Sequence, residues 1–297
     1  MNTWRAAAEG RATGTHSVPV SVVVPVRNEA HNLERCLRSV AWADEVFVID
    51  SQSTDATVQV AGQCGATVVQ FHYDGGWPKK KNWALANLPF RNAWVMLLDA
   101  DEVLPRGAED EFRRVITAGP EGVRGYWINR RFLFMGRWLR HAYYPNWNLR
   151  LFQHRVGRFE RITSAETDSG DVEIHEHVVV DGATRRLSCE MDHYAFPTVS
   201  VFVEKHNRYS NWEAHVALDA AASVSRGPSG ATSRIRHWAR HVPCRALLRF
   251  LYVYVWQCGF LDGREGYYFA RLHGFYEFLG VAKTYELRRK RTPDRVQ

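Results

Sequence analysis

The chain has 297 residues, 45% of them hydrophobic, and its formal net charge is +7. This length and apolar content support a packed core in one large domain, or in one domain with an appendage. The positive charge favours anionic partners such as nucleotide diphosphates, an acidic membrane surface or nucleic acid. No run of eighteen uninterrupted apolar residues occurs, so no transmembrane helix is predicted.

The five cysteines are scattered along the chain, and no pair has the spacing of metal ligands. We therefore expect reduced thiols in a cytosolic compartment. Residues 1–17 are polar and lack the apolar core of a signal peptide, so a flexible leader is expected there.

The first hundred residues predict strands that alternate with helices. Apolar residues recur at helical spacing after the first strand, and a short helix is predicted from Lys80 to Asn87. This alternation predicts a parallel, right-handed α/β sheet. The predicted strands are Val20–Val26, Glu45–Asp50, Ala66–Phe71 and Trp94–Leu98.

The pattern changes after about residue 120. A long helix is predicted from about Thr198 to Ala222, and the serine- and glycine-containing residues 223–233 indicate a linker. The predicted organisation is a leader over 1–17, an α/β domain over 18–222, the linker, and an amphipathic helical region over 234–290. Further strands are predicted at Gly125–Phe134, Asn148–Gln153 and Val178–Val180.

Two carboxylates follow the fourth predicted strand. Side chains alternate along a strand, so Asp99 and Asp101 are expected to share a face at its C-terminal end. In open α/β sheets ligands bind at that end. Paired carboxylates there form an oxygen site for a hard divalent cation, which in turn holds phosphates.

Four motifs occur in a specific order along the chain. They are Val23-Val-Pro-Val-Arg-Asn-Glu29, Val48-Ile-Asp-Ser-Gln-Ser-Thr-Asp55, Lys81-Asn-Trp-Ala-Leu85 and Leu98-Asp-Ala-Asp-Glu102. This series resembles family 2 glycosyltransferases, which have the GT-A fold, a Rossmann-like α/β architecture for nucleotide-diphospho-sugar transfer. Weaker motifs between His141 and Tyr285, among them His175-Glu176, resemble the bacterial subgroup of the lipopolysaccharide core β-1,4-glucosyltransferase.

The resemblance implies a role for each matching residue. Glu29 and Asp50 match positions that contact the uracil and ribose of the donor, and Lys81 matches a basic position that faces its diphosphate. Asp99 is implied to contact the ribose, the metal or a metal-bound water, and Asp101 to bind Mg²⁺ or Mn²⁺. A lysine can offset diphosphate charge as a flexible point cation, and the metal stabilises the leaving nucleoside diphosphate.

Several of these residues have a structural alternative. Asp55 is expected to cap a helix rather than bind a ligand, and Glu29 could be a first-turn carboxylate facing a helix dipole. The lysine run 79–81 is expected to be a solvated face, with only Lys81 in the site. Arg150 could face the donor phosphates or the acceptor, or pair with a carboxylate.

An inverting transfer needs a general base beside the acceptor hydroxyl. Glu176 matches the subgroup's His-Glu motif and is the preferred candidate, with Asp171 and Asp192 as alternatives. His175-Glu176-His177 lacks the spacing of zinc proteases. His193 is either a further metal ligand or a buried, hydrogen-bonded core histidine.

The C-terminal region is apolar, aromatic and basic. The run Ala246–Leu261 contains Arg249 and is preceded by further arginines. Basic residues beside a helix rich in aromatic residues suit an interfacial membrane position. The alternative is a helix packed on the α/β domain or on a second copy in a dimer. Nucleic-acid binding is not expected, since no recognised module for it is present. The preceding arginines are Arg234, Arg236, Arg240 and Arg245.

The resemblance thus implies an inverting, metal-dependent glycosyltransferase at the cytoplasmic face of the inner membrane. It would move a sugar from a nucleotide-sugar donor, expected to be a UDP-sugar, to a hydroxyl of a lipid-linked glycan such as lipopolysaccharide core. Its partners would be that donor, that acceptor and the anionic inner-membrane surface. Two alternatives remain at this point: a sugar-phosphate nucleotidyltransferase and a non-catalytic membrane-associated scaffold.

Overall fold

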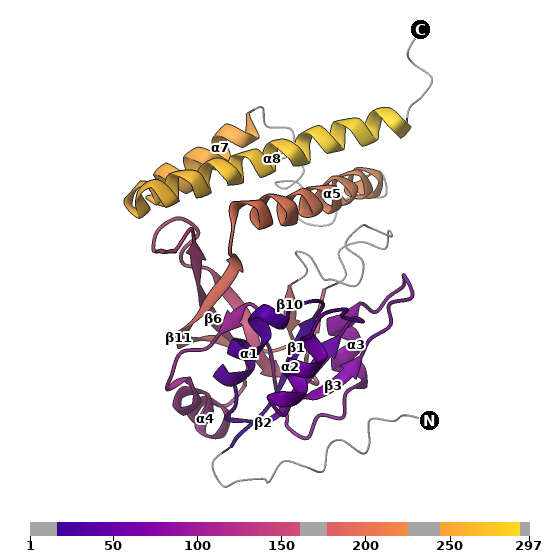
Figure 1. Cartoon of the computed structure of the whole chain (residues 1–297), viewed down its shortest axis with the longest axis vertical. Helices are drawn as coiled ribbons and strands as arrows, with labels where there is room; N and C mark the ends of the chain where they lie inside the picture. The colour runs from indigo at the N-terminus through magenta and orange to yellow at the C-terminus, as the bar shows by residue number, and fades with distance from the viewer. Residues whose placement is uncertain (1–16, 161–176, 225–243, 292–297) are drawn as a thin grey trace. The chain divides into compact units, whose positions relative to one another are not determined.

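The computed structural model describes residues 17–160, 177–224 and 244–291, and Figure 1 shows their elements. The chain divides into two compact units. Unit 1 contains residues 17–132, 145–160 and 177–195 of the described chain, and unit 2 contains residues 133–144, 196–224 and 244–291. Residues 1–16 of the predicted leader and residues 225–233 of the predicted linker lie outside the described residues.

Unit 1 is built on a mixed sheet with the strand order β3-β2-β1-β4-β8-β6-β11-β5. The first four strands are parallel, as predicted, and β8 then pairs antiparallel with both β4 and β6. The strands are β1 (Val18–Val26), β2 (Ala43–Asp50), β3 (Thr67–Gln70), β4 (Trp94–Leu97), β5 (Glu102–Val103), β6 (Val123–Phe134), β8 (Trp147–Gln153) and β11 (Ala183–Phe196).

The pleat of β1 explains why it is apolar along nearly its whole length. Val22 and Val24 belong to the apolar cluster that α1, α2 and α4 complete on one face of the sheet. Val23 points to the other face and packs with Ala84 of α3 and Phe159. A parallel strand covered on both faces buries every side chain, so the usual polar alternation is absent. The helices are α1 (Ala30–Ser39), α2 (Thr57–Gln63), α3 (Lys80–Asn87) and α4 (Ala108–Ala118).

A two-stranded sheet of β9 (Gly157–Phe159) and β10 (Val178–Val180) completes unit 1. The side-chain amide of Asn82 holds β9 to α3: its Oδ1 accepts the Phe159 N–H at 3.0 Å, and its Nδ2 donates to the Phe159 carbonyl at 3.2 Å. Beyond β9, the N–H of Glu160 donates to the carbonyl of His177 at 3.0 Å.

Unit 2 is helical and aromatic. It contains β7 (Arg137–Leu139), α5 (Val199–Val224), α7 (Arg245–Leu251), the π-helical turn η2 (Tyr252–Trp256), the 3₁₀ turn η3 (Gly259–Asp262) and α8 (Gly263–Arg291). Asp262 is buried, and its carboxylate accepts the backbone N–H groups of Arg140, His141 and Ala142 at 2.7 to 2.9 Å. Within the described chain, no helix is both long enough and apolar enough to cross a bilayer.

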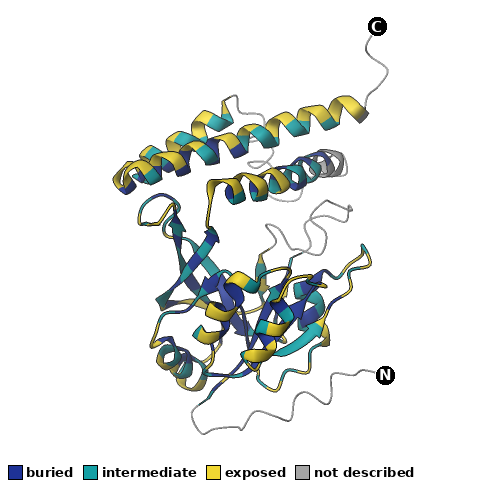
Figure 2. Ribbon diagram, viewed as in Figure 1, coloured by how far each residue is buried: buried dark blue, intermediate teal, exposed yellow. Residues whose placement is uncertain are grey.

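Aromatic side chains form the core of unit 2, and others remain on its surface. Phe134, Phe202 and Phe269 are fully buried and meet edge to face, with His206 stacked on Phe202 and His273 beside Phe269. Outside this core, much of the length of α7 and α8 is exposed (Figure 2). Trp256, at the end of η2, is 80% exposed.

Candidate active site

The loops that follow β1 and β2 are joined by side chain-to-backbone hydrogen bonds. Asn28 takes a left-handed conformation with φ 56°, which asparagine tolerates better than most residues. Its N–H donates to Ser53 Oγ at 2.8 Å, and its Oδ1 accepts the Thr54 N–H at 2.8 Å. Asp55 accepts the N–H of Ala30, the first residue of α1, at 3.2 Å and that of Thr57, the first of α2, at 3.0 Å. The predicted capping role of Asp55 is confirmed.

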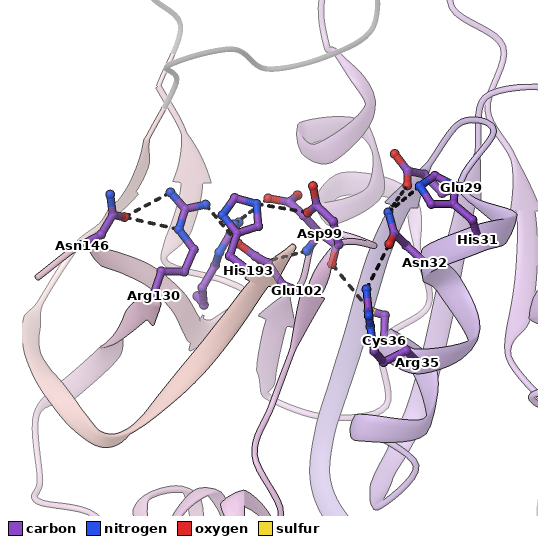
Figure 3. Close-up of polar contacts among 12 residues, drawn as sticks. Glu29, His31, Asn32, Arg35, Cys36, Asp99, Glu102, Arg130, Asn146 and His193 are labelled. Atoms are coloured by element: carbon purple, nitrogen blue, oxygen red, sulfur yellow. Dashed lines mark hydrogen bonds and ion pairs between the residues drawn. The ribbon is translucent and has the colours of Figure 1, made fainter. Parts of the chain in front are cut away.

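The two residues predicted to contact uracil and ribose, Glu29 and Asp50, lie in the hydrogen-bonded loops at the ends of β1 and β2. Asp50 is buried at the end of β2, where it accepts the Ser53 N–H at 3.1 Å and Gln70 Nε2 at 2.9 Å. Glu29 is the N-cap residue of α1, and its Oε2 accepts Asn32 Nδ2 at 3.0 Å. Figure 3 shows Glu29, His31, Asn32 and Arg35 on this side of the site. Both carboxylates are thus held in place by polar partners of their own unit.

Asp99 and Asp101 are placed by a turn and not by strand alternation. β4 ends at Leu97, so the expectation that both share a strand face is wrong. The Glu102 N–H donates to the Asp99 carbonyl at 2.9 Å, and the Asp99 N–H donates to Glu102 Oε2 at 2.9 Å. This reciprocal pair closes a four-residue turn that presents Asp99, Asp101 and Glu102 together.

Three cations converge on this turn from three other elements, and Figure 3 labels one of them, Arg130, beside Glu102 and Asn146. Lys81 Nζ of α3 lies 3.0 Å from Asp99 Oδ1, and Arg150 of β8 contacts both Asp99 and Glu102. Arg130 of β6 donates through Nη1 to Glu102 Oε1 at 3.1 Å and through Nη2 to Asn146 Oδ1 at 3.1 Å. Arg150 was expected either to face the donor or acceptor or to pair with a carboxylate, and in the structure it pairs with two carboxylates.

The lysine run at the start of α3 is not the solvated face that its charge suggested. Lys79 and Lys80 are both buried. Lys80 Nζ donates to the carbonyl of Val26 at 3.0 Å, at the end of β1. A long lysine side chain can bury its aliphatic stem while its ammonium finds a carbonyl. The run therefore fastens α3 to the strand end beside Lys81.

The ionisation of the turn follows from these contacts. Burial alone would raise the pKa of Asp99, but Arg150 and Lys81 outweigh it and hold that pKa well below its usual range. Burial likewise opposes the charge of Arg150, yet Asp99 and Glu102 raise the pKa of its guanidinium. Cys36, whose Sγ lies 3.6 Å from the Asp99 carbonyl, has a pKa raised well above the usual value by burial and then by the nearby carboxylates.

Asp101 and His193 form the part of the site that fits a divalent metal. His193 Nε2 lies 3.3 Å from Asp101 Oδ1, and the backbone of His193 pairs with Glu102 between β11 and β5. The ring stands edge-on to Phe132, and its buried Nδ1 has no hydrogen-bond partner among the described residues. The Asp101 carboxylate suits Mn²⁺ or Mg²⁺ with further oxygen ligands, and the His193 imidazole suits the transition metal Mn²⁺ better than the harder Mg²⁺. In the described parts of the chain no group of three or more such side chains could hold a metal.

Of the three candidate general bases, only Asp192 lies among the described residues. Glu176 and Asp171 lie outside the described residues. Asp192 is bound by Arg131, whose Nε donates to its Oδ1 at 2.8 Å. Glu102 is part of the motif Leu98–Glu102, but the sequence predicted no role for it. The sequence also did not predict that Arg130 and Asn146 belong to the site. No local pattern marks those two, because only the pairing of β6 with β8 brings them to the turn.

Comparison with known proteins identifies the family. A model described as Glycosyl transferase family 2 matches residues 21–169. The chain belongs to this family. An uncharacterized glycosyltransferase of Rickettsia bellii is 27% identical over 90% of this chain and 86% of its own. The lipopolysaccharide core biosynthesis glycosyltransferase LpsC of Rhizobium meliloti is 25% identical over 91% of this chain and 93% of its own.

Among solved structures, the mannosyltransferase PcManGT of Pyrobaculum calidifontis, in complex with GDP-Man and Mn²⁺, is 15% identical. The match has a TM-score of 0.46 and covers 91% of this chain and 88% of that one. The family assignment confirms the predicted GT-A fold and the enzyme class. The chain is a glycosyltransferase, and the nucleotidyltransferase and scaffold alternatives are set aside.

The lowered pKa of Asp99 predicts a pH-dependent contribution to stability. Its ionised form is favoured in the folded state, so this stabilisation is complete above the unfolded-state pKa of about 3.9 and is lost as the pH falls through the folded-state pKa. Asp99→Asn should therefore be less stable than wild type by a constant amount between about pH 7 and pH 5. The difference should shrink below about pH 4, as measured by urea unfolding across the pH range.

A matched control for this series is Asp181→Asn, which removes the exposed partner of Arg158. Surface substitutions of this kind usually change the free energy of unfolding by less than about 0.5 kcal/mol. A destabilisation by Asp99→Asn that stays the same from pH 7 to pH 3 would contradict the ionic role of Asp99.

Proposed function

We propose that this glycosyltransferase catalyses an inverting, metal-dependent transfer from a nucleotide sugar, expected to be a UDP-sugar, to a hydroxyl of a lipid-linked glycan. The observation that carries the proposal is the turn at the end of β4. There, Asp101 lies beside His193, while Lys81 and Arg150 converge on Asp99. Such a mixture of carboxylates and cations suits a ligand that is a diphosphate bound through a divalent ion.

Each side chain then has a distinct task. Asp101 and His193 would hold the metal, which stabilises the leaving nucleoside diphosphate when bound. Lys81 and Arg150 would neutralise the phosphate oxygens, and Asp99 orients both cations through its two carboxylate oxygens. Because both oxygens of Asp99 already have cationic partners, its contribution is to the ribose or a metal-bound water and not to direct coordination.

The acceptor hydroxyl needs a base on the far side of the sugar from the diphosphate. We assign this role to Glu176 on the His175-Glu176 motif. Two observations support it. Arg131 already neutralises Asp192, and the following residue, His177, is tied by backbone to Glu160 next to β9. β9 itself is held to α3 through Asn82, the neighbour of Lys81. The base removes the hydroxyl proton as the oxygen attacks the anomeric carbon in line with the leaving group.

The acceptor class is supported by the likeness to LpsC over nearly the whole chain, since that protein is named for lipopolysaccharide core biosynthesis. A lipid-linked acceptor requires the enzyme to work at a membrane surface, and we place it at the cytoplasmic face of the inner membrane. α7, η2, η3 and α8 carry exposed apolar and aromatic residues over one stretch of chain. These are Leu247, Leu248, Leu251, Tyr252, Val255, Trp256, Phe260, Leu261, Tyr267 and Tyr268.

Of the four arginines expected to face anionic lipid, only Arg245 lies among the described residues. Arg245 is half-buried and pairs with Glu277 at 2.6 Å, so it stabilises α7 against α8. Arg264 and Arg271 on α8 are exposed, and Arg271 lies over the Phe250 ring at 5.6 Å. Exposed arginines next to exposed aromatic side chains are the composition of an interfacial helix. Arg234, Arg236 and Arg240 lie outside the described residues.

Removing the metal ligand tests the donor site. Asp101→Ala should lower turnover by about 10²-fold or more, since a metal contributes several kcal/mol to charge stabilisation. A chelator should do the same to wild type. Circular dichroism should show an unchanged fold, and Asp181→Ala is the exposed control. Full activity in chelator, or in the Asp101 variant, would sink the assignment.

The base is tested by Glu176→Gln, which keeps the shape of the side chain and removes its basicity. Turnover should fall by about 10²–10⁴-fold, whereas the affinity for the donor, measured by calorimetry, should change little. Asp192→Asn is the comparison variant, and its effect should be smaller. Near-normal turnover of Glu176→Gln would transfer the assignment to Asp192.

Membrane attachment is tested by flotation with liposomes. Wild type should float with anionic vesicles and bind neutral ones less, with high salt weakening the attachment, because each arginine near the surface contributes about 1 kcal/mol. Trp256→Ser with Phe260→Ser and Leu261→Ser should reduce flotation. Val199→Ser with Val203→Ser, an exposed apolar pair on α5, should not. Equal flotation of the triple variant and wild type would place these side chains in a dimer interface instead.

A further inference from the structure

Glu102 is the buried centre of the charge cluster. Its side chain has no exposed surface, whereas that of Asp99 is 31% exposed. Oε2 accepts the Asp99 N–H at 2.9 Å, and Oε1 accepts Arg130 Nη1 at 3.1 Å and also contacts Arg150 Nη2. One carboxylate thus joins the end of β4 to cations from β6 and β8. A charge buried this deeply is tolerated only when it is paired and hydrogen-bonded.

We propose that Glu102 is a positioning residue of the donor site, which fixes the turn that carries Asp99 and Asp101 and balances the charge of Arg130 and Arg150 behind it. It does not touch donor or metal. The inference rests on the proposed function, because it concerns how the same site acquires its metal.

The first part of the argument is geometric. Two hydrogen bonds between Asp99 and Glu102 close the turn, and one of them uses the Glu102 side chain. The Glu102 backbone pairs with His193 across β5 and β11. Glu102 therefore sets the separation of the two proposed metal ligands from both directions: its side chain shapes the turn that holds Asp101, and its backbone fixes the strand that holds His193.

The second part is electrostatic. Arg150 Nη2 is shared by Asp99 and Glu102. Without the Glu102 charge, Arg150 keeps Asp99 as its carboxylate partner in this cluster, and Arg130 loses the carboxylate that it contacts. The surroundings of Asp101 then become more positive by one unit. Added positive charge disfavours a divalent cation and does not disfavour a diphosphate. Loss of metal affinity without loss of nucleotide affinity is the expected signature.

The variants separate charge from shape. Glu102→Gln is nearly isosteric and retains an oxygen for the Asp99 N–H, while its amide NH2 replaces the oxygen that accepts from Arg130 and Arg150. It therefore removes the charge and both arginine contacts but keeps the hydrogen bond that closes the turn. Glu102→Asp keeps the charge on a shorter side chain. Glu45→Gln is the matched control, because Glu45 is also buried on this sheet and paired with an arginine, Arg91 Nε, at 3.2 Å. Glu45 lies near the start of β2, while the turn follows the end of β4.

The measurement is the Mn²⁺ concentration that gives half-maximal binding of UDP, with UDP binding in chelator measured in parallel by calorimetry. For Glu102→Gln the required Mn²⁺ should rise by roughly 10- to 100-fold, the range for residues that support metal ligands. UDP binding in chelator should not weaken. Glu102→Asp should recover part of the Mn²⁺ affinity. Glu45→Gln should lose thermal stability yet require the same Mn²⁺ as wild type.

Two results would overturn the inference and leave the proposed function standing. One is a Glu102→Gln variant that requires no more Mn²⁺ than Glu45→Gln. The other is a variant that loses UDP binding equally in Mn²⁺ and in chelator, because that behaviour marks a residue needed only for folding. If wild type itself binds no nucleoside diphosphate in Mn²⁺, the proposed function fails, and the inference fails with it.

Discussion

The site depends on burying opposite charges together at the end of a parallel strand. Glu102 and Arg150 are removed from water, and each is tolerated there because it is paired: Glu102 with Arg130 and Arg150, and Arg150 with Glu102 and Asp99. Side chains from α3, β6 and β8 meet the turn after β4 in this cluster. Displacing one of these elements would leave a buried charge without its partner, which is costly, whereas apolar packing tolerates rearrangement when volume is conserved.

The parallel half of the sheet supplies the other requirement, which is a rigid edge. Each strand ends at a polar loop, and the loops after β1 and β2 are stapled through Asn28, Ser53 and Asp55. Helix N-termini that would otherwise leave backbone N–H groups without partners are satisfied by a carboxylate from the neighbouring loop. Ser53 also binds Asp50 through its N–H, and the Glu29 N–H donates to Thr57 Oγ1 at the start of α2, so the same loops hold both residues at this edge.

Unit 2 is held together mainly by aromatic packing and not by a charge cluster. Its core consists of aromatic rings that meet edge to face, and a single buried carboxylate, Asp262, fastens residues 140–142 by their backbone N–H groups. Outside that core, η2, η3 and α8 keep large apolar side chains in contact with solvent. Large exposed apolar side chains that recur along one stretch of chain indicate an interaction surface more than a stability requirement. The function proposed above assigns these side chains to a membrane surface.

The sequence by itself determined the parallel strands, the helix from Lys80 to Asn87, the existence of the later strands and the family, but not the antiparallel pairing of those later strands. These depend on local apolar periodicity and on short ordered motifs, which survive without knowledge of long-range contacts. It also located the carboxylates Asp99 and Asp101, although by the wrong geometry. The strand ends at Leu97, and the pair is presented by a turn that Glu102 closes.

Only the tertiary structure decided which charges meet. Lys79 and Lys80 appeared to be a solvated run, but burial against β1 shows that charge density does not report exposure. Arg130 and Asn146 reach the turn because β6 pairs with β8, a register that no local pattern encodes. From the sequence, Arg150 could contact the donor or acceptor or pair with a carboxylate, and only the structure shows its carboxylate partners, Asp99 and Glu102. Pairwise electrostatics depend on distances between residues far apart in the chain, and those distances exist only once the sheet has formed.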